Sequence, residues 1–293
     1  PTATASAVKP LDEIWRQAMN SRERVLCALH LQEPDRVPVD VWMSSGFSRK
    51  LERALGLTQD EFLDAHQVDL CYIVGPEYVG PPLATYADGS AEDIWGVRRR
   101  PVAVRLGEGT EVYKEVAHSP LHSARTVDDI ESYAHWPSAD WFDYRSIEAQ
   151  CEAGRQQGKA VVFMGDRLNR IAQLKPAMYL RGVEQILLDL RLNPDLAKEI
   201  FRRIRAFYRA YAQRIYEAAR GKLDIVLTGD DFGTQKGPMV SPAMWAEFLG
   251  PGFGEYVQMA KSYGLLVMHH TCGSVRPLIP LMVERGLDVL QSL

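Results

Sequence analysis

The chain has 293 residues, of which 46% are hydrophobic and 25% are charged, a composition that excludes disordered, collagen-like and coiled-coil proteins. Lys+Arg 34 against Asp+Glu 38 gives a net charge of −4 and no basic excess, so we do not expect nucleic acid as a partner. No apolar run approaches the roughly 20 residues of a membrane span, and residues 1–10 lack the apolar core of a signal peptide, so we expect no membrane association and a cytoplasmic location.

Apolar, strand-like runs alternate with capped helices along most of the chain. Residues 1–20 are predicted to be disordered or loosely attached, and the first helix is predicted over Ser21–His30. Further helices are predicted to begin at Thr58, at the Asn193–Pro194 pair and at Ser241. The predicted strands are Val37–Met43, Leu70–Gly75, Ala160–Met164, Leu223–Thr228, Leu265–His269 and Val289–Leu293.

The repeated order of strand then helix predicts a parallel sheet, and the length favours a closed (β/α)8 TIM-type barrel over an open sheet. We expect residues 21–293 to form this single domain. Between about residues 93 and 117, alternating apolar residues on either side of a Gly107–Thr110 turn predict an antiparallel hairpin, inserted over the barrel mouth. A barrel of this kind needs eight strands and about six are found, so we expect a C-terminally truncated chain that lacks the last strands.

Three of the predicted strands end in unusually polar segments, and in an α/β barrel these ends meet at one mouth. Arg167 and Arg170 follow the strand Ala160–Met164, and Asp230 and Asp231 follow Leu223–Thr228 within a segment that ends at Gln235. The two aspartates are candidate catalytic groups or metal ligands, and a helix cap is the alternative for either. Both arginines and Gln235 are candidates for binding substrate, although the arginines could equally neutralise neighbouring carboxylates.

The sequence His270-Thr271-Cys272 predicts a metal site. Residues two apart on an extended strand end point the same way, so the imidazole and the thiolate can reach one ion. Zinc accepts both ligands, but a catalytic zinc needs three from the protein, so Asp230, Asp231 or a residue beyond Leu293 must supply another. The alternative is a small buried thiol beside a structural histidine, because free cysteines are commonly buried. The four cysteines are too few and too scattered for a disulfide framework. His269 should point to the opposite side.

Three sets of motifs carry a resemblance to a known family. They are Ser21–Val25 with Glu33–Val39, Gly229–Gln235 with Ser241–Pro242, and His270–Val275 with Gly286–Leu290. Together they resemble the uroporphyrinogen decarboxylase superfamily, over a stretch from about Ser21 to the last residue.

This superfamily has two main chemistries on one (β/α)8 barrel. Its decarboxylases resemble one another in an early R-Q-A-G-R-Y segment, whose arginines hold the carboxylates of the porphyrinogen, and they need no cofactor. The present sequence has Val41–Phe47 (VWMSSGF) there, without either arginine. The second branch comprises methyltransferases that carry zinc on an H-x-C pair plus a distant C-terminal cysteine, and His270 and Cys272 match that pair.

The resemblance therefore implies a zinc-dependent methyltransferase that moves a methyl group between a corrinoid, carried by a partner protein, and a thiol or other small-molecule acceptor. His270 and Cys272 would be the metal ligands, with a third, cysteine ligand expected beyond Leu293. The alternative is a cofactor-free uroporphyrinogen decarboxylase of porphyrin biosynthesis, or a related decarboxylase, using Arg167, Arg170 and Asp231. Whether the chain forms a homodimer is left open.

Overall fold

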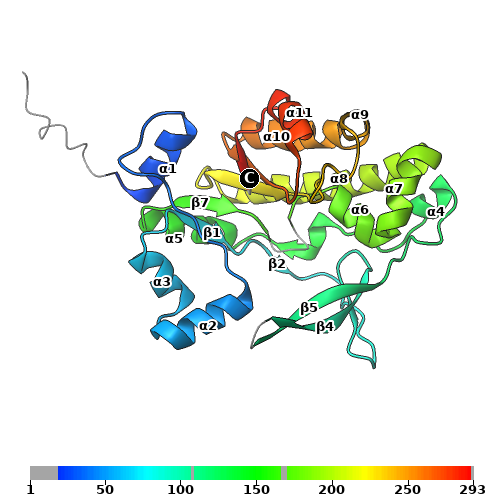
Figure 1. Cartoon of the computed structure of the whole chain (residues 1–293), viewed down its shortest axis with the longest axis horizontal. Coiled ribbons are helices and arrows are strands. Elements are labelled where there is room, and N and C mark those ends of the chain that lie inside the picture. Colours follow the sequence, from blue (N-terminus) through cyan, green and yellow to red (C-terminus); the bar gives the residue numbers. More distant parts are fainter. Residues whose placement is uncertain (1–18, 107–108, 166–169, 292–293) are drawn as a thin grey trace, which may run out of the picture.

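A computed structural model describes residues 19–106, 109–165 and 170–291 (Figure 1). Its α-helices are α1 (Ser21–Leu29), α2 (Ser45–Leu55), α3 (Gln59–Ala65), α4 (Val127–Glu131), α5 (Ile147–Gln156), α6 (Leu174–Arg181), α7 (Val183–Leu192), α8 (Pro194–Ala218), α9 (Pro242–Met244), α10 (Gly250–Ser262) and α11 (Ile279–Glu284). Shorter helical segments are the 3₁₀-helices η2 (Ala139–Trp141) and η4 (Arg276–Leu278) and the π-helix η3 (Trp245–Leu249). The strands are β1 (Leu70–Ile73), β2 (Glu77–Tyr78), β3 (Ala91–Glu92), β4 (Arg98–Leu106), β5 (Gly109–His118), β6 (Phe142–Asp143), β7 (Ala160–Phe163), β8 (Ile225–Gly229), β9 (Leu266–His270) and β10 (Val289–Gln291).

The centre of the molecule is a five-stranded parallel sheet in the order β1-β7-β8-β9-β10. Five of the six predicted barrel strands are therefore confirmed. Both faces of the sheet are covered, which explains why its strands are continuous apolar runs rather than alternating ones. On one face, Phe163 and Val267 pack with residues of α8 and α10, and on the other Val162 and Met268 lie in a separate apolar cluster with Val25 of α1.

The first predicted strand, Val37–Met43, is wrong, because this segment is extended but forms no strand. Among the described residues, its backbone pairing is limited to the carbonyl of Val39, which accepts from the amide of Asp69 at 2.9 Å. The amide of Val39 donates instead to the carboxylate of Asp69, at 2.7 Å. Val37 is 78% exposed, so its side chain has no second layer to pack against. An apolar alternation fits a strand only when a neighbouring strand continues the ladder.

The expected barrel of about six strands is accordingly reduced to five, and no closed barrel forms within residues 19–106, 109–165 and 170–291. In this part of the chain the sheet is open, with β1 and β10 at its edges. The mixed α/β architecture and the parallel sheet are confirmed, whereas closure into a (β/α)8 barrel and the division of the chain at residue 21 stay predictions. Residues 1–18, most of the predicted N-terminal segment, and Arg167 lie outside the described residues.

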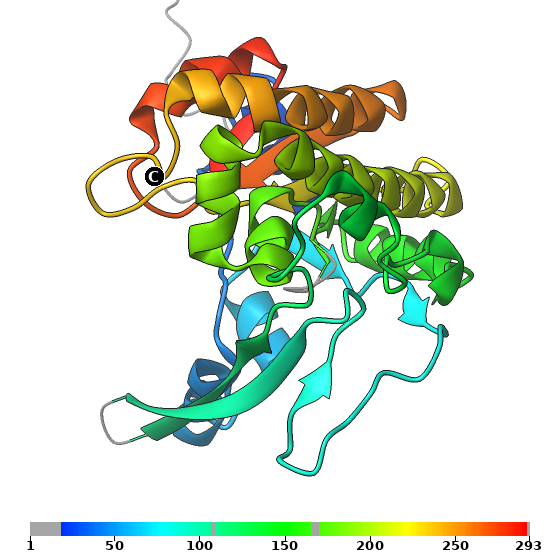
Figure 2. The ribbon, with the colours of Figure 1, turned by 90° about the vertical axis from the view of Figure 1, so that its right-hand side faces the viewer.

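The predicted hairpin is confirmed as the antiparallel sheet β3-β4-β5, which contains the long β4–β5 ladder. Figure 1 shows this hairpin and the α2–α3 pair on the side of the molecule opposite α10 and α11. Seen from the right-hand side in Figure 2, the hairpin and the loop that precedes it project away from α6 to α11, while the α2–α3 pair lies on the same side as the hairpin. The hairpin contacts α2 at Gly46, where an added Cβ would overlap the carboxylate of Glu111.

None of the described helices is both long enough and apolar enough to cross a membrane.

Candidate metal centre

The loops that follow β8 and β9 approach each other until their backbones touch. The amide of Gly233 donates to the carbonyl oxygen of Cys272 at 3.1 Å, and a Cβ on Gly233 would lie 2.6 Å from that oxygen. Gly273 has a φ of +83°, and a Cβ there would lie 2.5 Å from the carbonyl carbon of Gly233. Glycine is therefore needed at both positions. This contact brings the residues after β8 beside those after β9.

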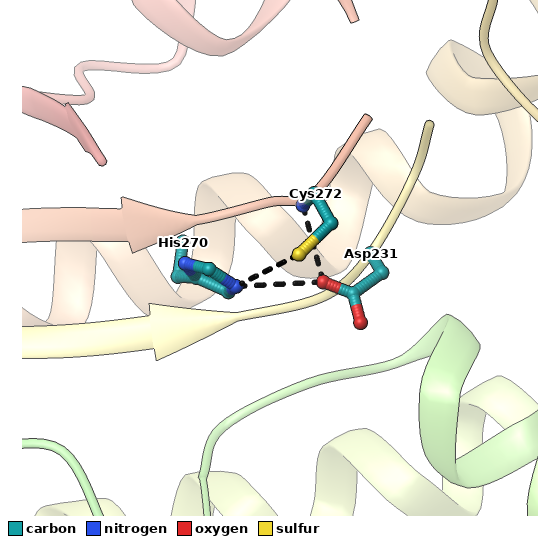
Figure 3. Close-up of side chains that lie close together, drawn as sticks. All are labelled: Asp231, His270 and Cys272. Carbon is teal, nitrogen blue, oxygen red and sulfur yellow. Dashed lines mark hydrogen bonds and ion pairs between the residues drawn. The ribbon is translucent and has the colours of Figure 1, made fainter. Parts of the chain in front are cut away.

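Asp231, His270 and Cys272 converge at this place (Figure 3). His270 is the last residue of β9, and Nε2 of its ring lies 3.3 Å from Sγ of Cys272, two residues further on. The same Nε2 lies 3.6 Å from Oδ1 of Asp231, which also accepts a hydrogen bond of 3.1 Å from the amide of Cys272. The predicted convergence of His270 and Cys272 is thus present, and both of the predicted aspartates lie at the same end of the sheet.

A lysine sets the charge of this cluster. The ammonium of Lys175, in α6, donates to Oδ2 of Asp231. Burial disfavours the ionised form of Asp231, but the hydrogen bond and charge of Lys175 outweigh it and lower the pKa of the carboxyl. At Cys272, burial and then the charge of Asp231 raise the pKa of the thiol above its ordinary value of 9.0. The cluster at neutral pH is therefore an anionic carboxylate beside a protonated thiol.

The three side chains fit a tetrahedral metal ion. Their ligand atoms all lie within 4.8 Å of one another. Two ligands at about 2.0–2.3 Å from one tetrahedral zinc ion stand roughly 3.3–3.8 Å apart. The distances of 3.3 Å between His270 and Cys272 and 3.6 Å between His270 and Asp231 already lie in that range. Imidazole, thiolate and carboxylate are all ligands that zinc accepts, and a three-residue site leaves a fourth position for a substrate.

His269 points to the other face of the sheet, as predicted. Its Nδ1 lies 2.8 Å from Oγ1 of Thr228, and its ring stacks on Phe232 at 5.3 Å between centroids. Burial lowers the pKa of His269 to about 3, so the ring is neutral at physiological pH. It is a packing residue, held away from the metal centre.

Asp230 lies beside the cluster but is occupied by the start of α6. Its Oδ2 accepts the backbone amides of Gln173 and Leu174 at 2.7 and 2.6 Å, and its Oδ1 accepts that of Lys175 at 2.7 Å. Burial raises the pKa of Asp230 to about 6, against the opposing effect of these three donors. Asp230 therefore orients α6 and, through it, the side chain of Lys175. Of the roles considered from the sequence, the helix cap describes this geometry.

Of the predicted substrate-binding residues that the structure describes, Arg170 lies near the ligand cluster and Gln235 lies in an exposed loop. Arg170 lies at the same end of the sheet, where its guanidinium carbon is 5.2 Å from the ring centroid of Trp42 and its Nη2 is 3.0 Å from Sδ of Met164. Gln235 is exposed in the loop after β8.

Three further residues of the centre were not assigned to it from the sequence. Lys175 belongs to no recognisable sequence motif, and its position beside Asp231 depends on the orientation of α6 in the fold. Trp42 belongs to the mispredicted first strand, and its ring lies 5.3 Å from that of His270. Gln291 hydrogen-bonds to Nδ1 of His270. From the sequence, Gln291 could have been placed beside His270 through the parallel register of the last two strands.

Comparison with known proteins finds a family match over the same part of the chain. Residues 172–292 match the family model described as uroporphyrinogen decarboxylase (URO-D). A solved structure, a methyltransferase from Methanosarcina mazei, is similar with a TM-score of 0.56 and 15% sequence identity over 93% of this chain and 75% of that chain, which supports the fold. No curated protein matches the chain. Because the matched residues include Asp231, His270 and Cys272, the resemblance to the uroporphyrinogen decarboxylase superfamily is confirmed for the segment that carries the candidate metal centre.

Proposed function

We propose that this protein is a zinc-dependent methyltransferase that moves a methyl group between a corrinoid, carried by a partner protein, and a thiol or other small-molecule acceptor. The observation that carries the proposal is the convergence of Oδ1 of Asp231, Nε2 of His270 and Sγ of Cys272 within 4.8 Å. A cofactor-free decarboxylase has no need of such a ligand set.

The segment around Trp42 gives further support. In the decarboxylases that the sequence resembles, this position carries arginines that bind carboxylates. Here Trp42 packs against the ring of His270 instead, with its indole nitrogen donating to the hydroxyl of Tyr72 at 2.8 Å. An aromatic side chain beside the ligand cluster is better suited to binding a small acceptor than to binding a polycarboxylate porphyrinogen.

The residues of the cluster would hold the metal as follows. His270 would bind it from the end of β9, Cys272 from the loop after β9, and Asp231 from the loop after β8. Zinc in this place would lower the pKa of a bound thiol substrate, so that the thiolate exists at neutral pH. Lys175 keeps the Asp231 carboxylate ionised and fixes its direction from the other oxygen. The thiol of Cys272, whose pKa is raised, gives up its proton when it becomes a ligand.

Arg170 offers a positive charge on the same side of the sheet, next to Trp42. This charge suits an anionic group on the acceptor, by charge-assisted hydrogen bonding. The corrinoid partner would approach from the end of the sheet at which Asp231, His270 and Cys272 lie.

Metal analysis combined with a transfer assay tests this proposal. Methylcobalamin serves as a free corrinoid donor, with a panel of low-molecular-weight thiols as acceptors. We expect the purified protein to hold about one zinc ion per chain, and Cys272→Ala to lose zinc and methyl transfer together. Full zinc content and full methyl transfer in Cys272→Ala would contradict the proposal. Absence of metal from the wild-type protein, together with turnover of a porphyrinogen, would favour the decarboxylase.

A further inference from the structure

The register of the parallel sheet places Gln291 directly beside His270. In the ladder between β10 and β9, Gln291 pairs with His270, and in the ladder between β9 and β8, His270 pairs with Gly229. Residues paired across neighbouring strands project from the same face of a sheet. His270 therefore has a glutamine on one side in its row and, at Gly229, no side chain on the other.

This pairing makes a hydrogen bond with a definite direction. Oε1 of Gln291 faces Nδ1 of the His270 ring. An amide oxygen only accepts, so Nδ1 carries the proton and donates it. In the neutral imidazole, which is the form that binds a metal, Nε2 then carries the lone pair, and Nε2 lies 3.3 Å from Sγ of Cys272. The hydrogen bond thus selects the tautomer in which Nε2 can act as a ligand.

We propose that Gln291 is a positioning residue of the metal centre, which fixes the tautomer and ring orientation of His270 for metal binding through Nε2. This inference rests on the proposed function, because it concerns the same metal. Carboxylates, carbonyls or waters commonly accept the second N–H of a metal-bound histidine, and losing such a partner lowers metal affinity by about 10–100-fold. An amide oxygen held on the neighbouring strand supplies the same type of acceptor.

The imidazole ring of His270 is also restrained by packing. Trp42 lies 5.3 Å from His270 with an interplanar angle of 42°. Trp42 is itself held by its hydrogen bond to Tyr72, whose hydroxyl donates to Asp40 at 2.7 Å. Packing of this kind limits tilting of the imidazole but does not choose between its two tautomers. That choice falls to the hydrogen bond that Nδ1 of His270 donates to Oε1 of Gln291.

Gln291→Met tests the inference, since methionine keeps the length of the side chain and removes the acceptor. Zinc affinity of the full chain is measured by competition with a chromophoric chelator. We expect Gln291→Met to bind zinc about 10–100-fold more weakly than wild type. Gln291→Glu, which retains an acceptor oxygen, should bind at least as tightly as wild type. Gln156→Leu is the matched control, because Gln156 contacts Glu152 on α5 and not His270.

A second readout does not depend on metal. In the metal-free protein, long-range ¹H–¹⁵N NMR of the imidazole, assigned with His270→Asn, should show the Nδ1–H tautomer in wild type and a mixture in Gln291→Met. If wild type binds zinc and Gln291→Met binds it equally well, the inference is overturned while the proposed function stands. A wild-type His270 in the Nε2–H tautomer overturns the inference by itself. A wild-type protein without affinity for zinc removes the proposed function, and the inference with it.

Discussion

Replacing Asp230 by asparagine should destabilise the fold rather than act on chemistry. The carboxylate is 2% exposed and accepts three backbone amides at the start of α6, two on Oδ2 and one on Oδ1. Asparagine keeps one oxygen, which can serve Gln173 and Leu174. It then turns an NH2 group toward the part-buried amide of Lys175, so that this amide loses its acceptor and two donors face each other.

The size of this effect follows from the lost contacts. An unsatisfied buried donor costs about 1–3 kcal/mol, and loss of a negative charge at a helix N-terminus costs roughly 0.3–1 kcal/mol more. Relief from burying the charge, which raises the pKa of Asp230 to about 6, offsets part of the sum. We therefore expect a loss of about 2 kcal/mol at pH 8, where wild-type Asp230 is ionised, or about 3 °C in Tm.

Thermal unfolding by circular dichroism measures the effect, with Asp231→Asn as the control on the neighbouring carboxylate. Asp231 is only half-buried, and its partners are the side chain of Lys175 and the amide of Cys272 rather than a helix terminus. A Tm for Asp230→Asn equal to that of wild type, or an equal loss in both variants, would refute the role assigned to Asp230.

Three other outcomes are expected. Asp231→Asn should change the stability by less than about 1 kcal/mol while weakening zinc binding and methyl transfer; unchanged zinc affinity would count against Asp231 as a ligand. Burial and the charge of Asp231 raise the pKa of the Cys272 thiol, so the thiol is protonated at neutral pH and must lose its proton when it binds the metal. Zinc affinity should therefore fall by up to about tenfold for each pH unit as the pH drops from 8 to 6. An affinity that is independent of pH in chelator competition would speak against a thiolate ligand. Gly233→Ala places a Cβ 2.6 Å from the carbonyl oxygen of Cys272 and should lower stability by about 1–3 kcal/mol, together with zinc affinity; a variant with wild-type Tm would show that the two loops can separate freely.

The sequence was sufficient for the parts of the site that depend on strand periodicity. His270 and Cys272 are two residues apart at a strand end, so their shared direction follows from the geometry of an extended chain. Asp231 follows a neighbouring parallel strand, and parallel strands deliver their ends to one edge of the sheet. The five strands of the sheet were likewise recognisable as buried apolar runs.

Features that depend on tertiary placement could not be predicted in this way. Val37–Met43 has the composition of a strand, but strand formation needs a partner ladder on at least one side. Asp230 and Asp231 are adjacent and chemically identical in sequence. Only the position of α6 separates them, by placing three backbone amides against Asp230 and the ammonium of Lys175 against Asp231.

Cobalt substitution tests the central claim most directly, because it reports the ligands themselves. Metal-free protein is titrated with Co²⁺, and absorption is recorded for wild type, Cys272→Ser and His270→Ala. The account predicts saturation at about one ion per chain, with the intense visible bands of tetrahedral cobalt and a thiolate-to-cobalt charge-transfer band that is lost in Cys272→Ser. A wild-type protein that binds no cobalt, or a charge-transfer band that persists in Cys272→Ser, would contradict it.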